Sequence, residues 1–172
     1  GQTMTMGCVA PDIFAGLGIN AGPAPGTSSG QIGSVAGTTS SQVNTCTDWA
    51  GSNWAHFDTQ ITSIVHGASD FTVNTGYGQR DFDIFASIYG VSQDAGTNSI
   101  AGGGSEITAT KDGKETVSYI SVAGMAHAWP AGEGPGCNYC DTNKVNYPEF
   151  LSDWLFHNNR RVIGNATPMV NQ

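Results

Sequence analysis

The apolar positions of the chain fall into short runs, and the spacing within each run predicts its secondary structure. Residues 61–66 are rich in β-branched side chains and are closed by Gly67, which predicts a buried strand entering a turn. In residues 78–89 apolar side chains recur every three or four positions, which predicts a helix with one apolar face. A further helix is predicted from Tyr147 onward, since Pro148 is tolerated in a first helical turn.

Other segments extend this pattern toward both ends of the chain. Residues 2–10 predict a short, largely buried helix that ends at the following proline, and residues 14–20 predict a strand. Residues 106–110 and 116–122 predict the two arms of a hairpin, because the Asp112-Gly113 pair between them is a strong turn signal.

Strand, helix and strand therefore alternate through most of the chain. This order predicts an α/β fold, with a sheet whose two faces are both covered by helices. In such sheets, functional side chains collect at the carboxyl ends of the strands. A length of 172 residues suffices for one compact domain with its own core.

The charge balance narrows the class of partner. The chain has 14 acidic and 6 basic residues, for a net charge of -8. Nucleic acids and anionic membrane surfaces both attract a positive field, so neither is expected as a partner. No apolar run reaches the roughly 18 residues of a membrane span. Only 12% of the residues are charged and 24 are glycine, a composition common in secreted proteins.

The four cysteines agree with a secreted location, where two disulfides are more common than four free thiols. Three pairings are possible. Cys137 and Cys140 could bridge locally within a Gly/Pro-rich loop, and Cys8 would then pair with Cys46. A zinc site would need a second close pair of ligands, and a thioredoxin-like role would need a preceding strand; the sequence offers neither. A possible N-glycosylation triplet begins at Asn165.

Two side chains with catalytic chemistry follow predicted strands. Asp70 lies in the turn after residues 61–66, and His127 lies in the loop after residues 116–122. A serine esterase needs a histidine to take and return a proton, and a carboxylate to hold the imidazole in the correct tautomer. We expect His127 and Asp70 to fill these two roles. The alternatives are a turn aspartate that caps the next helix and an ordinary loop or core histidine.

A candidate nucleophile is harder to place. Residues 26–30, Gly-Thr-Ser-Ser-Gly, match the Gly-x-Ser-x-Gly pattern around Ser28 and precede Asp70 and His127 in the required order. However, the pattern needs a strand running into the serine and a helix leaving it. Residues 22–41 are instead rich in Pro, Gly, Ser and Thr without periodicity, which predicts a long loop. Ser28 is therefore not the favoured nucleophile.

Four stretches of the sequence are distinctive: MGCVAPDIFAG (6–16), INAG (19–22), HGASDFTV (66–73) and GMAHAWP (124–130). Together they resemble the esterase and polyhydroxybutyrate depolymerase family of the α/β-hydrolases, and the last two are the more specific. The resemblance implies an α/β-hydrolase-type sheet with helices on both faces. Residues 1–172 would form the C-terminal part of a single catalytic domain.

The same resemblance implies a function. Asp70 would be the acid of a Ser-His-Asp triad and His127 its general base, while Trp129 would line the groove for the acyl or polymer chain. The serine would lie just upstream of Gly1, on an N-terminal segment or chain, so this chain alone is expected to be inactive. The implied protein is a secreted esterase acting on a polyester such as poly(3-hydroxybutyrate) or on a small ester, without a metal or an organic cofactor.

Two other functions fit the same sequence. A related carboxylesterase could act on feruloyl or acetyl esters of plant polysaccharides, because a fold does not fix its substrate. A non-catalytic module could use Trp49, Trp54 and Trp129 as a platform on which a polymer stacks. Ester hydrolysis that depends on His127 would separate an enzyme from a binding module.

Overall fold

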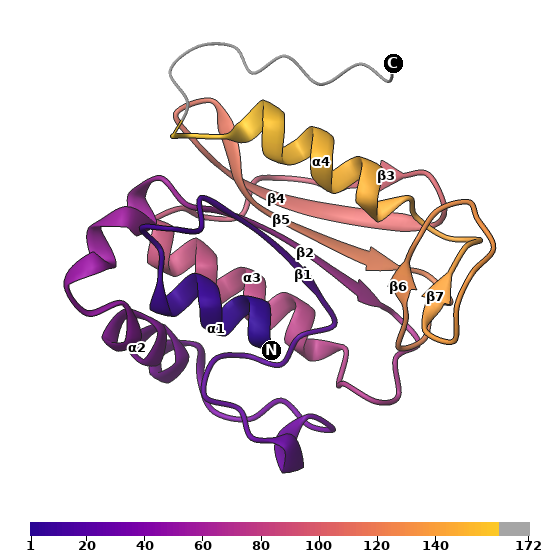
Figure 1. The fold of residues 1–172 in the computed structure, drawn as a ribbon, viewed down its shortest axis with the longest axis horizontal. Helices are drawn as coiled ribbons and strands as arrows, with labels where there is room; N and C mark the ends of the chain where they lie inside the picture. The colour runs from indigo at the N-terminus through magenta and orange to yellow at the C-terminus, as the bar shows by residue number, and fades with distance from the viewer. Residues whose placement is uncertain (162–172) are drawn as a thin grey trace.

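The centre of the fold is a five-stranded sheet. A computed structural model describes residues 1–161, and its sheet has the strand order β1-β2-β5-β4-β3 (Figure 1). Three adjacent strands run parallel: β1 (Gly16–Asn20), β2 (Ile61–Gly67) and β5 (Lys114–Val122). β4 (Gly104–Lys111) and β3 (Asn98–Ile100) continue the sheet in antiparallel pairing. The fold is therefore mixed α/β, as the alternation of strands and helices predicts.

Helices cover both faces of this sheet (Figure 1). They are α1 (Gln2–Val9), α2 (Thr39–Ala50), α3 (Gly76–Tyr89) and α4 (Tyr147–Asn158), with the 3-10 helices η1 (Ser29–Gln31) and η2 (Gly51–Asp58). A Cβ added to Gly7 of α1 would lie 2.3 Å from the Leu17 side chain. One added to Gly18 would lie 2.3 Å from Leu151 of α4. Since Leu17 and Gly18 are consecutive in β1 and point to opposite faces, α1 and α4 pack on opposite sides of the sheet.

The strand β2, which lies between β1 and β5, is buried along its whole length. Its β-branched residues suit this position, because a strand covered on both faces needs no polar alternation. On one face Ile64 packs in a cluster with Phe82 and Phe85 of α3. On the other face Val65 packs in a cluster that includes Met125, from the loop after β5. This packing fixes the carboxyl ends of β2 and β5 next to one another.

Most elements expected from the sequence are confirmed. The helices α1, α3 and α4 and the strands β1, β2, β4 and β5 lie close to where the sequence predicts them. The hairpin turn uses Asp112 and Gly113 at φ 54° and 76°, the left-handed geometry that this pair favours. One expectation is wrong: residues 22–41 are not a continuous loop, because η1 interrupts them and α2 begins at Thr39.

All four cysteines form disulfides. Cys8 pairs with Cys46 and joins α1 to α2. Two short parallel strands follow the histidine loop, β6 (Trp129–Pro130) and β7 (Cys140–Asp141). Cys137 pairs with Cys140, the first residue of β7. These pairings leave no thiolate for a zinc site.

Two further expectations concern the surface and the end of the chain. In the part of the chain that the structure describes, no helix is both long enough and apolar enough to cross a membrane. The glycosylation triplet at Asn165 lies outside the described residues.

Candidate active site

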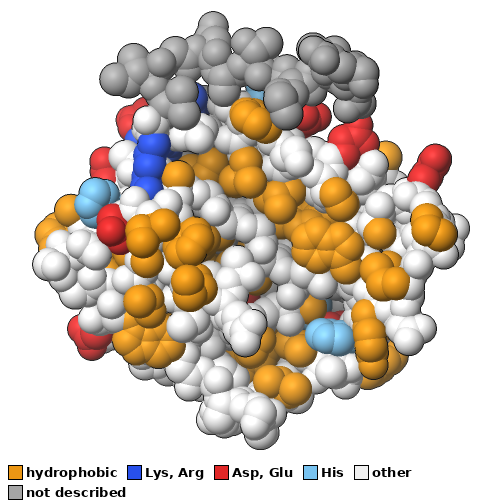
Figure 2. Space-filling model, viewed as in Figure 1, with side chains coloured by type: hydrophobic (Ala, Val, Ile, Leu, Met, Phe, Trp, Pro, Cys, Tyr) orange, Lys and Arg blue, Asp and Glu red, His pale blue; other side chains and the backbone are white. Residues whose placement is uncertain are grey.

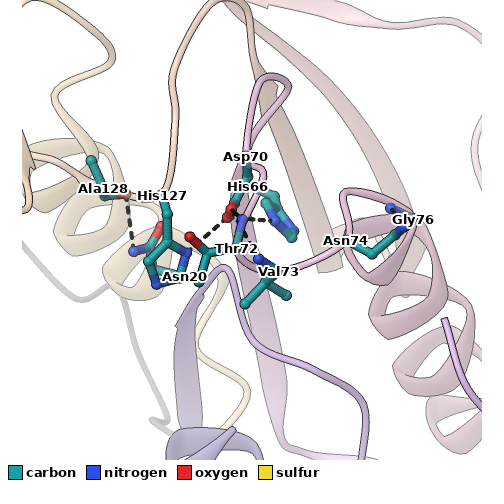
Figure 3. Close-up of polar contacts among 9 residues, drawn as sticks. All are labelled: Asn20, His66, Asp70, Thr72, Val73, Asn74, Gly76, His127 and Ala128. Atoms are coloured by element: carbon teal, nitrogen blue, oxygen red, sulfur yellow. Dashed lines mark hydrogen bonds and ion pairs between the residues drawn. The ribbon is translucent and has the colours of Figure 1, made fainter. Parts of the chain in front are cut away.

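Asp70 lies in the turn after β2, at the carboxyl end of the parallel strands (Figure 3). Its side chain is buried, and Oδ1 accepts hydrogen bonds from the amides of Thr72 at 2.8 Å and Val73 at 3.0 Å. Asp70 does not cap the next helix, because the N-cap residue of α3 is Thr75. The two amides fix one carboxylate oxygen, and the other oxygen, Oδ2, faces His127.

The loop that carries His127 is bonded directly to the Asp70 turn. The amide of Ser69 donates to the Met125 carbonyl at 2.9 Å. The two loops are so close that a Cβ on Gly67 would lie 2.3 Å from this carbonyl oxygen, and only glycine has room there. This close contact brings His127 Nδ1 to 2.8 Å from Asp70 Oδ2.

The His127–Asp70 pair has the geometry of an imidazole oriented by a carboxylate. Since an ionised carboxylate only accepts hydrogen bonds, Nδ1 of His127 carries the proton and Nε2 is the basic nitrogen. The Asp70 side chain has no exposed surface, whereas 36% of the His127 side chain is exposed. Within residues 1–161, Nε2 of His127 makes no hydrogen bond, and the ring lines a cavity. The pair can therefore accept a proton from a group in that cavity.

A second histidine binds the same carboxylate. Nε2 of His66, near the end of β2, lies 3.1 Å from Asp70 Oδ2 (Figure 3). The His66 side chain is buried, and its Nδ1 has no hydrogen-bond partner among the described residues. From the sequence alone, His66 is expected only to be part of the strand over residues 61–66. Its position four residues before Asp70, across a glycine turn, is the signal that could have identified it.

Burial and hydrogen bonding act in opposite directions on the pKa of Asp70. Burial alone would raise this pKa, but the hydrogen bonds from His127 and from the amides of Val73 and Thr72 hold it below its ordinary value of 3.8. Burial also lowers the pKa of His66 below 6.5, and this effect exceeds the opposing attraction of Asp70. At neutral pH the site therefore contains a carboxylate anion beside a neutral His66.

A cavity of about 470 Å³ opens beside His127. Its lining residues are Asn20, Thr72, His127, Ala128, Trp129 and Tyr139. Asn20, at the carboxyl end of β1, donates from Nδ2 to the Ala128 carbonyl at 3.1 Å and so holds the histidine loop from a second side. The amide of Trp129 donates to the Tyr139 carbonyl at 2.7 Å, which joins the two aromatic residues of the wall. A cavity of this size suits a small organic ligand.

The structure does not bring Ser28 together with His127. Ser28 is the exposed N-cap residue of η1, and its Oγ donates to Gln31 Oε1 at 2.9 Å. Among residues 1–161, no hydrogen bond joins Ser28 to Asp70 or to His127. No strand leads into the serine, as the composition of its loop predicts.

Trp49 and Trp54 lie away from the cavity. Their exposed fractions are 39% and 65%, on α2 and on η2, which follows it directly. Figure 1 shows α2 and β6, which carries Trp129, on opposite sides of the molecule. The three tryptophans therefore do not form one stacking platform.

The described residues contain no group of three or more His, Cys, Asp or Glu side chains arranged to hold a metal ion.

Comparison with known proteins identifies relatives of this chain, although no protein-family model matches it. The poly(3-hydroxybutyrate) depolymerase of Ralstonia pickettii is 49% identical over 166 residues, which cover 94% of this chain and 34% of that protein. Nearly the whole chain is homologous to part of a poly(3-hydroxybutyrate) depolymerase. The poly(3-hydroxyalkanoate) depolymerase C of Paucimonas lemoignei is 30% identical over 81 residues, which cover 46% of this chain and 20% of that protein.

This similarity confirms the resemblance of the chain to the depolymerase family. Because the Ralstonia alignment covers 94% of the chain, it includes both Asp70 and His127. The chain spans about a third of the length of the Ralstonia depolymerase and about a fifth of the length of the Paucimonas depolymerase.

Proposed function

We propose that this chain provides the acid, Asp70, and the base, His127, of a Ser-His-Asp triad in an esterase that hydrolyses a polyester such as poly(3-hydroxybutyrate). The observation that carries the proposal is the 2.8 Å contact between His127 Nδ1 and Asp70 Oδ2 beside a cavity. The name of the Ralstonia relative, a poly(3-hydroxybutyrate) depolymerase, supports the substrate class. The parallel order β1-β2-β5 supports an α/β-hydrolase sheet, of which residues 1–172 form the C-terminal part.

The proposed nucleophile is a serine on an N-terminal segment that docks beside His127. Two observations support this placement over Ser28. Ser28 Oγ is hydrogen-bonded to Gln31, and the cavity wall formed by the described residues contains no serine. Asp70 also precedes His127, which is the order that α/β-hydrolases use after the serine. The segment that carries the serine is therefore the partner this chain needs for activity.

In the proposed reaction, His127 acts through Nε2. This nitrogen takes the proton of the serine hydroxyl while the serine Oγ attacks the ester carbonyl carbon. Asp70 stabilises the resulting imidazolium through Nδ1, and the imidazolium returns the proton to the leaving alkoxide. An acyl-enzyme remains. Water then attacks the acyl carbon with Nε2 again as the base, which releases the acid and restores the serine.

The surface around the cavity suits a neutral ester. Trp129 and Tyr139 line the cavity, and the side chain of Phe71, next to Asp70 in sequence, is 97% exposed. Figure 2 shows a face whose middle carries mostly hydrophobic and uncharged polar atoms, with charged side chains toward its rim. Aromatic and apolar walls of this kind bind uncharged ligands well. The two disulfides support an extracellular location, where such bonds persist.

A release assay with the natural full-length protein tests the function. Poly(3-hydroxybutyrate) film and feruloylated xylan are supplied separately, and released 3-hydroxybutyrate or ferulate is measured. We expect 3-hydroxybutyrate from the film, and no product from the 172-residue chain alone. Release of ferulate only would contradict the polyester substrate. Failure to hydrolyse either polymer or a short chromogenic ester would contradict the esterase. The intact mass of the natural protein, with a search for a further segment or chain that contains Gly-x-Ser-x-Gly, then tests whether the proposed serine is present.

A further inference from the structure

Asp70 receives more hydrogen bonds than the orientation of one imidazole requires. Oδ1 accepts from the amides of Thr72 and Val73, and Oδ2 accepts from Nδ1 of His127 at 2.8 Å and from Nε2 of His66 at 3.1 Å. A carboxylate offers about four acceptor positions, so these donors occupy all of them. The bond from His66 is the one that the proposed reaction leaves unexplained.

His66 has a fixed protonation pattern. Because an ionised Asp70 only accepts, Nε2 of His66 carries the proton and Nδ1 is bare. Nδ1 is buried and has no partner among the described residues, so the ring has no second hydrogen bond through which to pass a proton on. Burial lowers the pKa of His66 and keeps the ring neutral at pH 7. His66 is therefore a hydrogen-bond donor and not a proton carrier.

Packing alone does not account for a histidine at this position. The side chain is 1% exposed, on a strand whose other residues are all buried. A buried ring nitrogen without a partner destabilises a fold, whereas a leucine would fill similar space without that penalty. The larger favourable polar contact of His66 is its bond to Asp70, and the backbone of Val73 adds a smaller attraction.

The two ends of the carboxylate differ in how they are held. The amides on Oδ1 both bind one oxygen, so the carboxylate can still pivot about that oxygen. Oδ2 is held by His127, whose own ring is partly exposed on a loop, and by His66, which is fixed in the buried strand β2. Among residues 1–161, only His66 anchors Oδ2 independently of the imidazole that the carboxylate has to orient.

We propose that His66 is a positioning residue, whose Nε2–H holds Asp70 Oδ2 in the direction that orients His127. This proposal deepens the esterase function proposed above and rests on it only for its kinetic consequence. The orientation itself is a property of the 172-residue chain and can be measured without any ester.

The spectroscopic test compares His66→Leu with His66→Gln in the natural full-length protein. The glutamine amide reaches about as far as Nε2 of histidine and retains a donor, whereas leucine has none. The wild-type chain and His66→Gln should show a downfield proton resonance for Nδ1–H of His127. In His66→Leu this resonance should broaden or disappear, while the urea unfolding midpoint stays the same or rises. If His66→Leu does not fold, His66→Met replaces it.

A sharp, unshifted resonance in the leucine or methionine variant would overturn the proposal. Loss of the resonance in both His66→Gln and His66→Leu, together with a lower unfolding midpoint, would also overturn it, because histidine would then have a purely structural role.

The kinetic test uses the natural full-length protein and a soluble short-chain ester. His66→Leu should lower kcat on the order of tenfold at constant KM, an effect similar to loss of an outer partner of a metal-bound histidine. His66→Gln should recover most of this loss, and His157→Leu, at an exposed position on α4, should match the wild type. A change in KM alone would contradict the positioning role. If no preparation hydrolyses an ester, the esterase function fails, and the resonance still decides the role of His66.

Discussion

The two sides of the cavity are built in different ways. On the histidine side, Asp70 and His127 follow buried parallel strands, and backbone hydrogen bonds join their loops. On the opposite side, Trp129 belongs to a two-residue strand, and Tyr139 lies in a small loop closed by one disulfide. The Tyr139 side chain is 70% exposed, whereas the Asp70 side chain is fully buried.

This difference separates two tasks within one site. Groups that move protons need fixed distances, which a packed sheet edge provides. Groups that contact a polymer need accessible apolar surface, and an irregular loop can provide it without altering the sheet. Substitutions on the histidine side should therefore change turnover, and those on the aromatic side should change the affinity for the ester.

The largest expected effect comes from removal of the base. In the full-length protein, His127→Ala should reduce kcat by at least about a thousandfold, as losses of triad histidines do. KM and the unfolding midpoint should change little, because His127 is partly exposed and contributes few core contacts. Initial rates on a chromogenic ester measure this. Tyr139→Ala is the matched variant on the aromatic side, and it should raise KM while leaving kcat near the wild-type value. Wild-type rates in His127→Ala would eliminate it as the base.

Separation of the two loops on the histidine side should have the next largest effect. A Cβ at Gly67 would lie 2.3 Å and 2.4 Å from the carbonyl oxygens of Met125 and Ala126, so Gly67→Ala must push the loops apart. We expect a loss of about 3 kcal/mol in the free energy of unfolding, measured by urea denaturation. Gly30→Ala is the control, because its Cβ would meet nothing within 4 Å. Equal stability of the two variants would show that the loops are not held together.

Removal of the local disulfide should affect the aromatic side. Cys137 and Cys140 are three positions apart, so replacing both by serine should lower the free energy of unfolding by only about 2 kcal/mol. KM should rise because the loop that carries Tyr139 loosens. The control replaces Cys8 and Cys46, which are 38 positions apart. This replacement should lower the free energy of unfolding by about 4 kcal/mol and leave KM unchanged. A larger KM effect from the second pair would contradict the division between the two sides.

The smallest effect is a pH dependence of stability on the histidine side. The folded-state pKa of His66 lies below 6.5, so below that pH the unfolded chain binds a proton that the native chain excludes. Stability should therefore fall as the pH drops below 6.5, with a contribution of up to about 1.4 kcal/mol per pH unit. His66→Gln should remove this contribution, which urea unfolding at several pH values measures. An unchanged slope in that variant would show that His66 does not cause it.

The pairing of Asp70 with His127 could be predicted from sequence because each follows a recognisable strand. Parallel strands bring their carboxyl ends to one edge, so two turn residues far apart in sequence meet there. The signal from His66, its position four residues before Asp70, was weaker, because a histidine inside an apolar run is equally compatible with a core position. Tyr139 was missed as a cavity residue because its loop has no periodicity from which a direction could be inferred.

The helix α2 was missed for a different reason. Its buried residues are Gln42, Cys46 and Ala50, spaced four apart but without a large apolar side chain. Its stability comes instead from reciprocal capping between Thr38 and Ser41 and from the disulfide at Cys46. The buried face of this helix carries small or polar side chains, so no run of large apolar residues marks it in the sequence.

The complete set of protein donors around Asp70 also affects how the site responds to charge. A carboxylate in water stabilises a new cation only after the surrounding solvent has reoriented. The dipoles around Asp70 are already aligned by the turn after β2, by His66 and by the closed contact at Gly67. A positive charge that forms on His127 would therefore meet an environment with a small reorganisation free energy.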